Sequence, residues 1–286
     1  MSLLTGLGKF GLKYLEDADL FEEEKKKENQ SDKAKPAVTV MAEEDYLFDK
    51  TYECPVCYGS FKERTVRTGK AKLMRTDLDL RPVYDNFEPL KYDVVVCPHC
   101  GYAALSRFFT GMPSFQQKAI KEMMATTNTR PLQKKDTYSY DEAVDRYKLT
   151  LAYAIVKHAK TSEKAYVCLK GGWLLRSMGE YLRKVAPDQE QKWQELKEQE
   201  DEFLKNALEG FLTARQTENF PICGMEQFTL DYLVSVLAMN NEQYEVAAKL
   251  ISGILTARNA NNRIKEKARD LREQLIIKVK GKSVNK

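Results

Sequence analysis

The chain has 286 residues, of which 43% are hydrophobic and 31% charged, and its formal net charge is +4. This length is long for one domain and sufficient for two with a sizeable core, and so small a net charge implies no dominant electrostatic partner. Six cysteines are too few for a disulfide scaffold in a chain of this size.

The N-terminal part is expected to be an accessory segment. Residues 1–20 place apolar side chains at helical spacing, but three glycines weaken an isolated helix there. The stretch EEEKKKENQSDKAKPA (22–37) lacks aromatic residues and is too polar to order itself, so it is expected to be a linker. We therefore assign 1–45 to an N-terminal segment and charged linker.

The sequence favours a cytoplasmic protein. The first twenty residues lack a basic start with a continuous apolar run, and no apolar stretch approaches the roughly 18 residues that span a bilayer. In the cytoplasm thiols stay reduced, so the expectation is free or metal-bound cysteines rather than disulfides.

Residues 46–102 are predicted to be β-rich. The segment KERTVRTGKAKLMRTDLDLRPVY alternates its side chains and is interrupted by Gly69 and Pro82, and YDVVV has the composition of a short buried strand. Two cysteine pairs stand near its ends: Cys54-Pro-Val-Cys57 and Cys97-Pro-His-Cys100.

The two pairs predict a zinc ribbon over residues 46–112. Two thiolates at i and i+3 on a tight turn can both reach one ion at about 2.3 Å while backbone amides bond the sulfurs. The proline after each first cysteine would set the turn, and the small Gly59 and Gly101 would let the chain leave it. The predicted ligands of one structural Zn²⁺ are Cys54, Cys57, Cys97 and Cys100. Four thiolates leave no position for water, so this pattern predicts structure and not hydrolysis, and no catalytic residue is predicted.

Alternatives for the cysteines stay open. A thioredoxin-like dithiol at Cys97 and Cys100 would require strands and helices to alternate around the motif, and would leave the first pair without a role. His99 could replace a cysteine as a ligand, although with four cysteines present it is expected to point outward. Cys168 and Cys223 lie beside apolar residues and are expected to be buried free thiols.

From Pro113 onward the pattern predicts helices almost to the end of the chain. The expected segments are 113–126, 139–160, 162–185, 188–217, 226–240, 242–258 and 261–278. Gly171 and Gly172 inside one of these helices would each cost up to about 1 kcal/mol unless another helix packs closely against them. The predicted fold class is therefore α+β and mostly α, with a helical domain at 113–286.

The helical part shows features of tetratricopeptide-like repeats. Two segments carry an aromatic residue followed by small and bulky residues at the spacing of a second repeat helix; their residues are Tyr140, Ala143, Tyr147 and Thr150, and Tyr244, Ala247, Ile251 and Ile254. The spacing between aromatic residues is not the regular 34, so degenerate repeats are expected and an ordinary helical bundle is the alternative.

Helical pairs of this kind stack into a concave surface that binds peptides or other proteins. The first functional hypothesis is a non-enzymatic interaction or scaffold protein. The alternative is a nucleic-acid-associated factor that uses basic residues of the ribbon, namely Arg64, Arg67, Arg75 and Arg81. A solvated charged face would explain the same arginines without nucleic acid.

The chain resembles the bacterial domain-of-unknown-function 2225 family. The matching pieces are SLLTGLGKFGL, YECPVCYGSFKERTVRTGKAKLMRTDLDLRPVYDNFEPLKYDVVVCPHCGYAA and FPICGMEQFTLDYLVSVLAMNNEQYEVAAKLISGIL, and the middle piece is the most specific. The resemblance implies a metal-binding N-terminal part with tetratricopeptide-like helices behind it. The implied ligands are Cys54, Cys57, Cys97 and Cys100, and no activity is implied.

Overall fold

A computed structural model describes residues 41–126 and 132–284 of the chain. Most of the predicted N-terminal segment and linker lies outside the described residues. The described residues from Ala42 onward belong to one compact unit.

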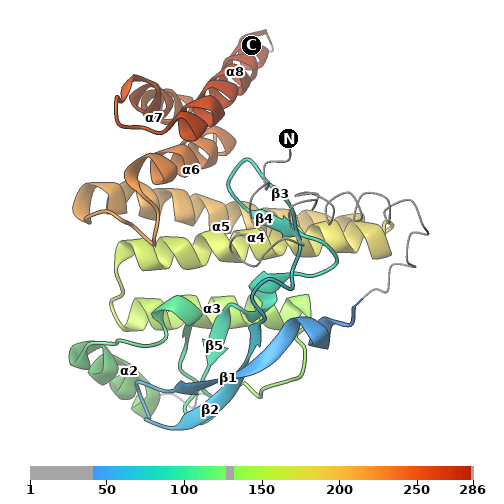
Figure 1. Cartoon of the computed structure of the whole chain (residues 1–286), viewed down its shortest axis with the longest axis vertical. Helices are drawn as coiled ribbons and strands as arrows, with labels where there is room; N and C mark the ends of the chain where they lie inside the picture. The colour runs from blue at the N-terminus through green and yellow to red at the C-terminus, as the bar shows by residue number, and fades with distance from the viewer. Residues whose placement is uncertain (1–40, 127–131, 285–286) are drawn as a thin grey trace, which may run out of the picture. The chain divides into compact units, whose positions relative to one another are not determined.

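The predicted β-rich region contains three separate hairpins. The strands are β1 (Leu47–Glu53), β2 (Ser60–Val66), β3 (Leu73–Thr76), β4 (Pro82–Tyr84), β5 (Val94–Val96) and β6 (Ala103–Leu105). They pair in antiparallel fashion as β1–β2, β3–β4 and β5–β6 (Figure 1). The β-rich region therefore forms three two-stranded sheets, each of which satisfies its own backbone pairing and relies on other elements for a core.

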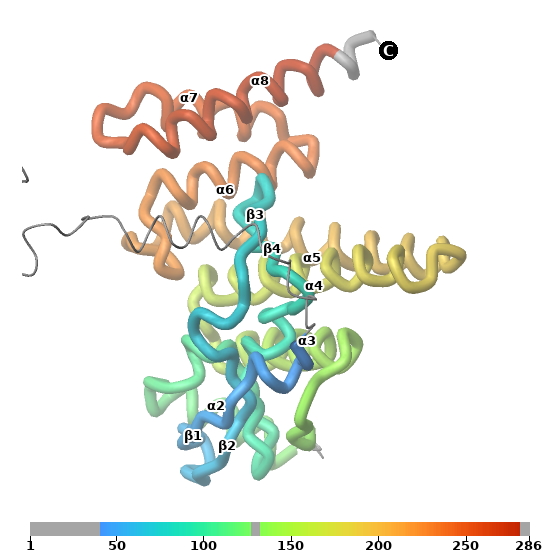
Figure 2. Tube along the Cα trace, turned by 45° about the vertical axis from the view of Figure 1, so that its right-hand side comes forward, coloured from blue at the N-terminus to red at the C-terminus, as the bar shows by residue number. Residues whose placement is uncertain are grey.

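The helices follow the predicted order. They are α2 (Ser114–Thr126), α3 (Tyr140–Val156), α4 (Thr161–Val185), α5 (Glu190–Thr217), α6 (Gln227–Asn240), α7 (Tyr244–Thr256) and α8 (Asn262–Val284). From α3 to α8 each helix packs on the next one in the chain (Figures 1 and 2). The fold is α+β and mostly α, as predicted. None of these helices, within the part of the chain that is described, has the length and apolar character needed to cross a bilayer.

The start and end of α3 have identifiable causes. At its start, Ser139 Oγ accepts a hydrogen bond from the Glu142 amide at 3.2 Å, and Glu142 Oε2 accepts one from the Ser139 amide at 2.9 Å. This reciprocal pair is a capping box. At its end, the backbone of His158 is left-handed, with φ of 50°. The helix therefore stops at Val156, four residues before the predicted end.

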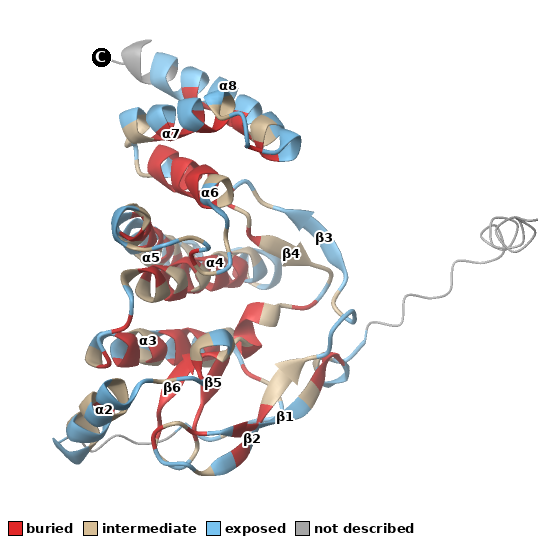
Figure 3. Ribbon diagram, turned by 60° about the vertical axis from the view of Figure 1, so that its left-hand side comes forward, coloured by how far each residue is buried: buried red, intermediate tan, exposed pale blue. Residues whose placement is uncertain are grey.

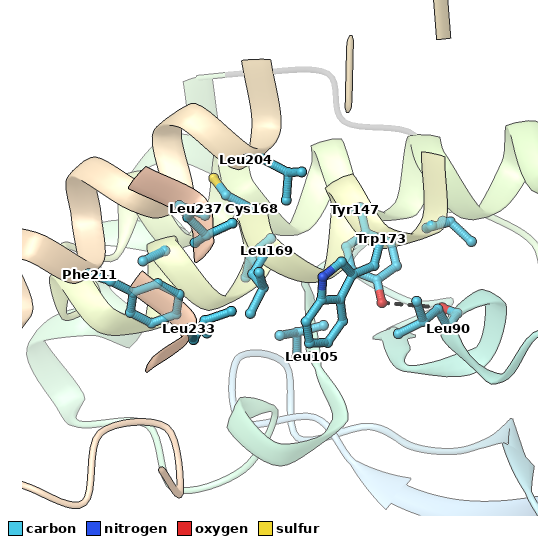
Figure 4. Packing of buried hydrophobic residues seen from close by; sticks show 14 of the residues in the cluster. Leu90, Leu105, Tyr147, Cys168, Leu169, Trp173, Leu204, Phe211, Leu233 and Leu237 are labelled. Carbon is cyan, nitrogen blue, oxygen red and sulfur yellow. Dashed lines mark hydrogen bonds between the residues drawn. The ribbon is translucent and has the colours of Figure 1, made fainter. Parts of the chain in front are cut away.

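Helices α4 and α5 pack closely because α4 carries two glycines at the contact. A methyl group added at Gly171 would lie 2.6 Å from Phe203 Cε1, and one added at Gly172 would lie 2.7 Å from Leu204 Cδ2. The prediction of close packing at the glycine pair is confirmed. Leu204, Leu169 and Phe211 belong to the apolar layer between these helices and α6 (Figure 4).

One hydrophobic core includes residues from both the strands and the helices. Val95 and Leu105 of the third hairpin belong to the same buried cluster as Tyr147 of α3 and Leu233 of α6. Figure 3 shows buried residues running from β5 and β6 through α3 and α4 to α6. The strand-rich region thus obtains its core from the helices. The domain boundary at residues 112/113 stays a prediction made from the sequence.

Candidate metal centre

The first cysteine pair lies in the turn between β1 and β2. Cys54 directly follows β1, and its amide donates to the Gly59 carbonyl at 3.0 Å while its carbonyl accepts from the Tyr58 amide at 2.9 Å. The Val56 amide donates to Cys54 Sγ at 3.4 Å. We call residues 54–59 the first knuckle. Its backbone bonds turn amide groups toward sulfur, which stabilises a thiolate.

The second pair repeats this geometry between β5 and β6. The Cys97 amide donates to the Tyr102 carbonyl at 2.8 Å, and the Cys97 carbonyl accepts from the Gly101 amide at 2.9 Å. We call residues 97–102 the second knuckle. The two knuckles carry the same pair of hydrogen bonds at matching positions, although 37 residues separate them in the sequence.

The exits of the two knuckles differ. Gly101 has φ of 81°, a left-handed conformation that suits glycine, whereas the matching residue of the first knuckle is Tyr58, with φ of 60°. The expectation that Gly59 opens the first turn is therefore wrong. Gly59 has a different role, because a methyl group there would lie 2.4 Å from Nδ1 of His99. The missing side chain makes room for the imidazole.

The four sulfurs come together. All four Sγ atoms lie within 4.8 Å of one another, and the pairs Cys54–Cys100 and Cys57–Cys97 are each 3.6 Å apart. In a regular tetrahedron with metal–sulfur bonds of about 2.3 Å the sulfurs are about 3.8 Å apart. Cys54 and Cys97 are fully buried, while Cys57 is exposed. The arrangement suits one thiophilic metal ion at the edge of the core.

Without an ion the cluster cannot carry four negative charges. Hydrogen bonds from Cys100 and then Cys54 hold the pKa of Cys97 well below its usual range, despite burial. Cys100 also lowers the pKa of Cys54, but Cys97 and burial outweigh this effect and raise it to about 12. The metal-free cluster thus favours a thiolate at Cys97 and a thiol at Cys54, and a divalent cation would allow both to ionise.

A buried phenol adjoins this cluster. Tyr153 of α3 is 2% exposed, and in the described residues its hydroxyl has no hydrogen-bond partner. Burial, and after it the charge of the sulfurs of Cys100, Cys54 and Cys97, raises the pKa of Tyr153 to about 12.

The other candidate residues lie apart from the four sulfurs. His99 is exposed and packs edge-on against Phe61, with ring centroids 6.3 Å apart, and His158 is also exposed. Cys168 is buried in α4, as predicted, whereas Cys223 is half-buried and its Sγ lies 3.3 Å from the Ser162 carbonyl oxygen. Burial raises the pKa of each of these two thiols to about 11, so both stay protonated at neutral pH.

Two arginines of the nucleic-acid alternative are tied to the strand region. Arg64 lies 3.4 Å from Asp49 and 2.5 Å from Asp136, and its side chain is 19% exposed. Arg67 donates from Nε to the Leu47 carbonyl at 2.8 Å. Arg64 is thus paired with carboxylates within the protein, whereas Arg67 is exposed and is held by a backbone carbonyl.

The other two lie on the second hairpin. Arg75 is 59% exposed and 3.2 Å from Asp77, whereas Arg81 is 1% exposed. Arg81 donates to Asp77 at 2.7 Å and to Ser177 at 2.9 Å. Its predicted place on a basic surface is wrong, and among the four candidates Arg67 and Arg75 are exposed.

Comparison with known proteins gives the family. The model of the family described as "Uncharacterized protein conserved in bacteria (DUF2225)" matches residues 47–275. The chain belongs to this family. The matched range contains both knuckles and the helices from α2 into α8, so the four-cysteine cluster and the helical part are features of a family member and not of an appended segment.

A curated relative adds little beyond this. A protein of Borreliella burgdorferi named "Uncharacterized protein" is 29% identical over 89 residues, which is 28% of this chain and 32% of that protein. The match thus spans about a third of the relative's own length. No solved structure matches the chain.

Proposed function

We propose that this protein is a non-enzymatic interaction or scaffold protein, with one structural Zn²⁺ held by four cysteines and a partner-binding surface on its helices. The observation that carries the metal part is the meeting of four sulfurs from two equivalent knuckles. Zinc suits four thiolates in a tetrahedron, and such closed sites stabilise folds.

The ion would join the two hairpins that bear the knuckles. Each is a two-stranded sheet, which is at best marginally stable in isolation. Four protein ligands would fill the coordination sphere and leave no position for a reacting water, which supports a structural role. Reduced thiolates also favour a reducing compartment such as the cytoplasm.

The partner-binding part rests on the helices. Consecutive helices from α3 to α8 pack on one another, as in repeat proteins that bind other proteins. The small positions of the proposed tetratricopeptide-like helices face inward, since Ala143 is 1% and Ala247 0% exposed, and Tyr147 is 1% exposed; Tyr140 and Tyr244 are half-buried. This burial supports a stack of helical pairs whose repeat length is irregular.

Metal analysis tests the zinc site. The purified full chain should contain about one zinc per molecule, and Cys97→Ser should lose most of it. Cys223→Ser is the matched control, because it removes a half-buried thiol outside the cluster and should retain the metal. A folded wild-type protein without zinc or another thiophilic metal would contradict the proposal.

Site-specific photocrosslinking in living cells tests the partner-binding role. The crosslinker would be placed at exposed helical positions such as Ile155 and Tyr181 and, as a control, at Lys50 on β1. We expect discrete protein adducts at particular helical positions and none at Lys50. Equal labelling at all positions, or no adduct at any, would argue against a helical partner surface.

A further inference from the structure

A cavity lies where the three hairpins meet α4. It has a volume of about 450 Å³ and is lined by residues of β1, β2, β4, α4 and two short 3₁₀ helices, η4 (Pro89–Tyr92) and η5 (Ser106–Phe108). In Figure 3, β1 and β4 lie along the same side of α3 and α4. We call this space the hairpin cavity. Its volume is within the range of small-molecule sites, about 300–1,000 Å³.

The charged groups in the lining are three cations and one carboxylate. The cations are Lys50 of β1, Arg107 of η5 and Lys170 of α4, and the carboxylate is Asp93, which directly precedes β5. Lys170 and Asp93 form an ion pair, and Asp93 also accepts a hydrogen bond from Ser106 Oγ at 2.9 Å. This pair is neutral as a whole. The lining therefore has a net charge of +2, which comes from Lys50 and Arg107.

Lys50 keeps its positive charge available. It is exposed, and its Nζ lies 5.0 Å from the centre of the Tyr52 ring, a contact that does not neutralise the ammonium group. Glu63 stands opposite Lys50 in the strand pairing, but it is 2% exposed and lies 2.8 Å from Arg146. In the described part of the chain no carboxylate forms a salt bridge with Lys50. An anion in the cavity would therefore not have to displace an acidic side chain from it.

Arg107 is held in place without being neutralised. Its Nη1 donates to the Cys223 carbonyl at 2.7 Å, and its guanidinium carbon lies 5.2 Å from the ring centres of both Phe108 and Tyr166. The side chain is exposed, and within the described residues Nε and Nη2 donate to no acceptor. These two groups form one edge of the guanidinium. An edge with two parallel donors matches the oxygens of a phosphate.

The other walls of the cavity are largely apolar. Pro82, Tyr84 and Pro89 are half-buried, and Tyr52 is 6% exposed. An inorganic ion would fill only a small part of this space and would leave the rings and prolines without a contact. The lining therefore suits an anion that carries an apolar or aromatic group.

We propose that the hairpin cavity binds a small phosphate monoester that carries an apolar or aromatic group. Lys50 and Arg107 bind the phosphate oxygens, and the organic group packs against Pro82 and Tyr84. A phosphate monoester has a charge of about −1.5 to −2 at neutral pH, which matches the free charge of the lining. The site goes beyond the proposed scaffold role, because it is separate from the four cysteines and requires no protein partner.

The probe is phenyl phosphate, titrated calorimetrically into the full chain at about 0.15 M salt. Two reference compounds separate charge from shape. Phenyl sulfate has nearly the same shape but a single charge, and inorganic phosphate has the charge without the ring. We expect saturable binding of phenyl phosphate with a Kd below about 1 mM, and binding about tenfold weaker or less for each reference compound.

Variants test the two cations. Lys50→Gln should weaken binding of phenyl phosphate about tenfold or more, because it removes a charged donor from an exposed position on which the fold does not depend. Arg107→Lys should also weaken binding, since lysine keeps the charge but not the two-donor edge. The matched control is Lys62→Gln, an exposed lysine on β2 outside the lining, which should leave affinity within about twofold.

Three outcomes would overturn the inference: no detectable binding of phenyl phosphate, equal affinity for phenyl sulfate, or an equal loss in Lys50→Gln and Lys62→Gln. Tighter binding of a single-stranded RNA of about ten nucleotides, weakened equally by both lysine variants, would also overturn it and would indicate a nucleic-acid surface. None of these results bears on zinc content or on photocrosslinks at the helices. The proposed function and this site can therefore fail separately.

Discussion

At the scale of single residues, Gly172 sets the distance between α4 and α5. Gly172→Ala should destabilise the protein by about 1–3 kcal/mol, because the new methyl group would overlap Leu204, which is 3% exposed and cannot move into solvent. Urea unfolding of the full chain measures the change.

The control is a glycine in a helix with open space around it. A methyl group at Gly253 of α7 would meet no atom within 4 Å, so Gly253→Ala should stabilise the protein by up to about 1 kcal/mol through helix propensity alone. Opposite signs at the two positions would establish packing as the cause. The same sign at both would contradict it.

Asp77 gives a residue-scale prediction about pH. Burial would raise its pKa, but the hydrogen bond from Arg81 and the charges of Arg81, Arg75 and Arg176 outweigh burial and lower it below 3.8, the ordinary value. The stabilisation is therefore fully present above about pH 4 and is lost as the pH falls through the lower folded-state pKa. Asp77→Asn should cost about 1–3 kcal/mol at pH 7.

The difference between wild type and Asp77→Asn should shrink in urea unfolding as the pH is lowered from 5 to about 3. Glu209→Gln, an exposed change on α5, should stay within about 0.5 kcal/mol throughout. A difference that stays constant or widens in acid would refute the assignment to this carboxylate.

Residues whose role depends on near neighbours in the sequence could be predicted, and others could not. The cysteine pairs and the glycine pair were identifiable because their spacing is the signal. Arg81 was assigned to the surface because its partners Ser177 and Glu180 lie about a hundred residues away. Nothing in the sequence around Arg81 indicates that a distant helix would bury it.

At the scale of elements, a buried ion pair joins β2 to α3. Glu63 and Arg146 are each 2% exposed and 2.8 Å apart. Arg146 also donates to the Val94 carbonyl at 2.8 Å, and Tyr138 donates to Glu63 at 2.6 Å. The first and third hairpins are thus attached to the same helix.

Arg146→Met should destabilise the protein by about 3–5 kcal/mol, because it leaves the Glu63 carboxylate buried without a cation. Adding Glu63→Gln should recover part of the loss, since glutamine can accept from Tyr138 without carrying a charge. A double-mutant cycle in urea measures the coupling. Additive losses would show that the two groups do not depend on each other.

Helices were easier to predict than strand pairing. Helix starts carry local signals such as the capping box at Ser139, whereas the division of the strands into three hairpins depends on which segments find a partner in three dimensions. The first knuckle shows the same limit. A tyrosine in a left-handed turn was not anticipated, because glycine is the usual residue there.

At the scale of the whole molecule, some helices pack directly on the proposed metal site and others lie away from it. Tyr102 of the second knuckle packs against Tyr153 of α3, with ring centroids 5.5 Å apart, whereas α7 and α8 pack on α6 and on each other. Chelation of the metal under reducing conditions should therefore speed amide hydrogen exchange about tenfold or more in β1, β2, β5, β6 and α3. Exchange in α7 and α8 should change little.

The metal-deficient variant Cys57→Ser provides the comparison, since the chelator should have no further effect on it. Uniform loss of protection across all helices after chelation would mean that the fold depends on the ion as one cooperative unit. Unchanged protection in the hairpins would mean that the ion contributes nothing to their stability.

The unusual backbone of Tyr58 ties the first knuckle to α2. A left-handed conformation costs a non-glycine residue about 1 kcal/mol, yet the side chain reaches α2, where its hydroxyl donates to Gln117 at 3.0 Å and Lys121 lies 5.0 Å from its ring. Helix α2 fully buries only Ile120 and packs the partly buried Met123 and Met124 against the core, so the contacts of Tyr58 add to a small anchoring surface. A structural change at the four sulfurs would therefore reach helix α2 first. The surface around its exposed Phe115 would change before the rest of the protein does.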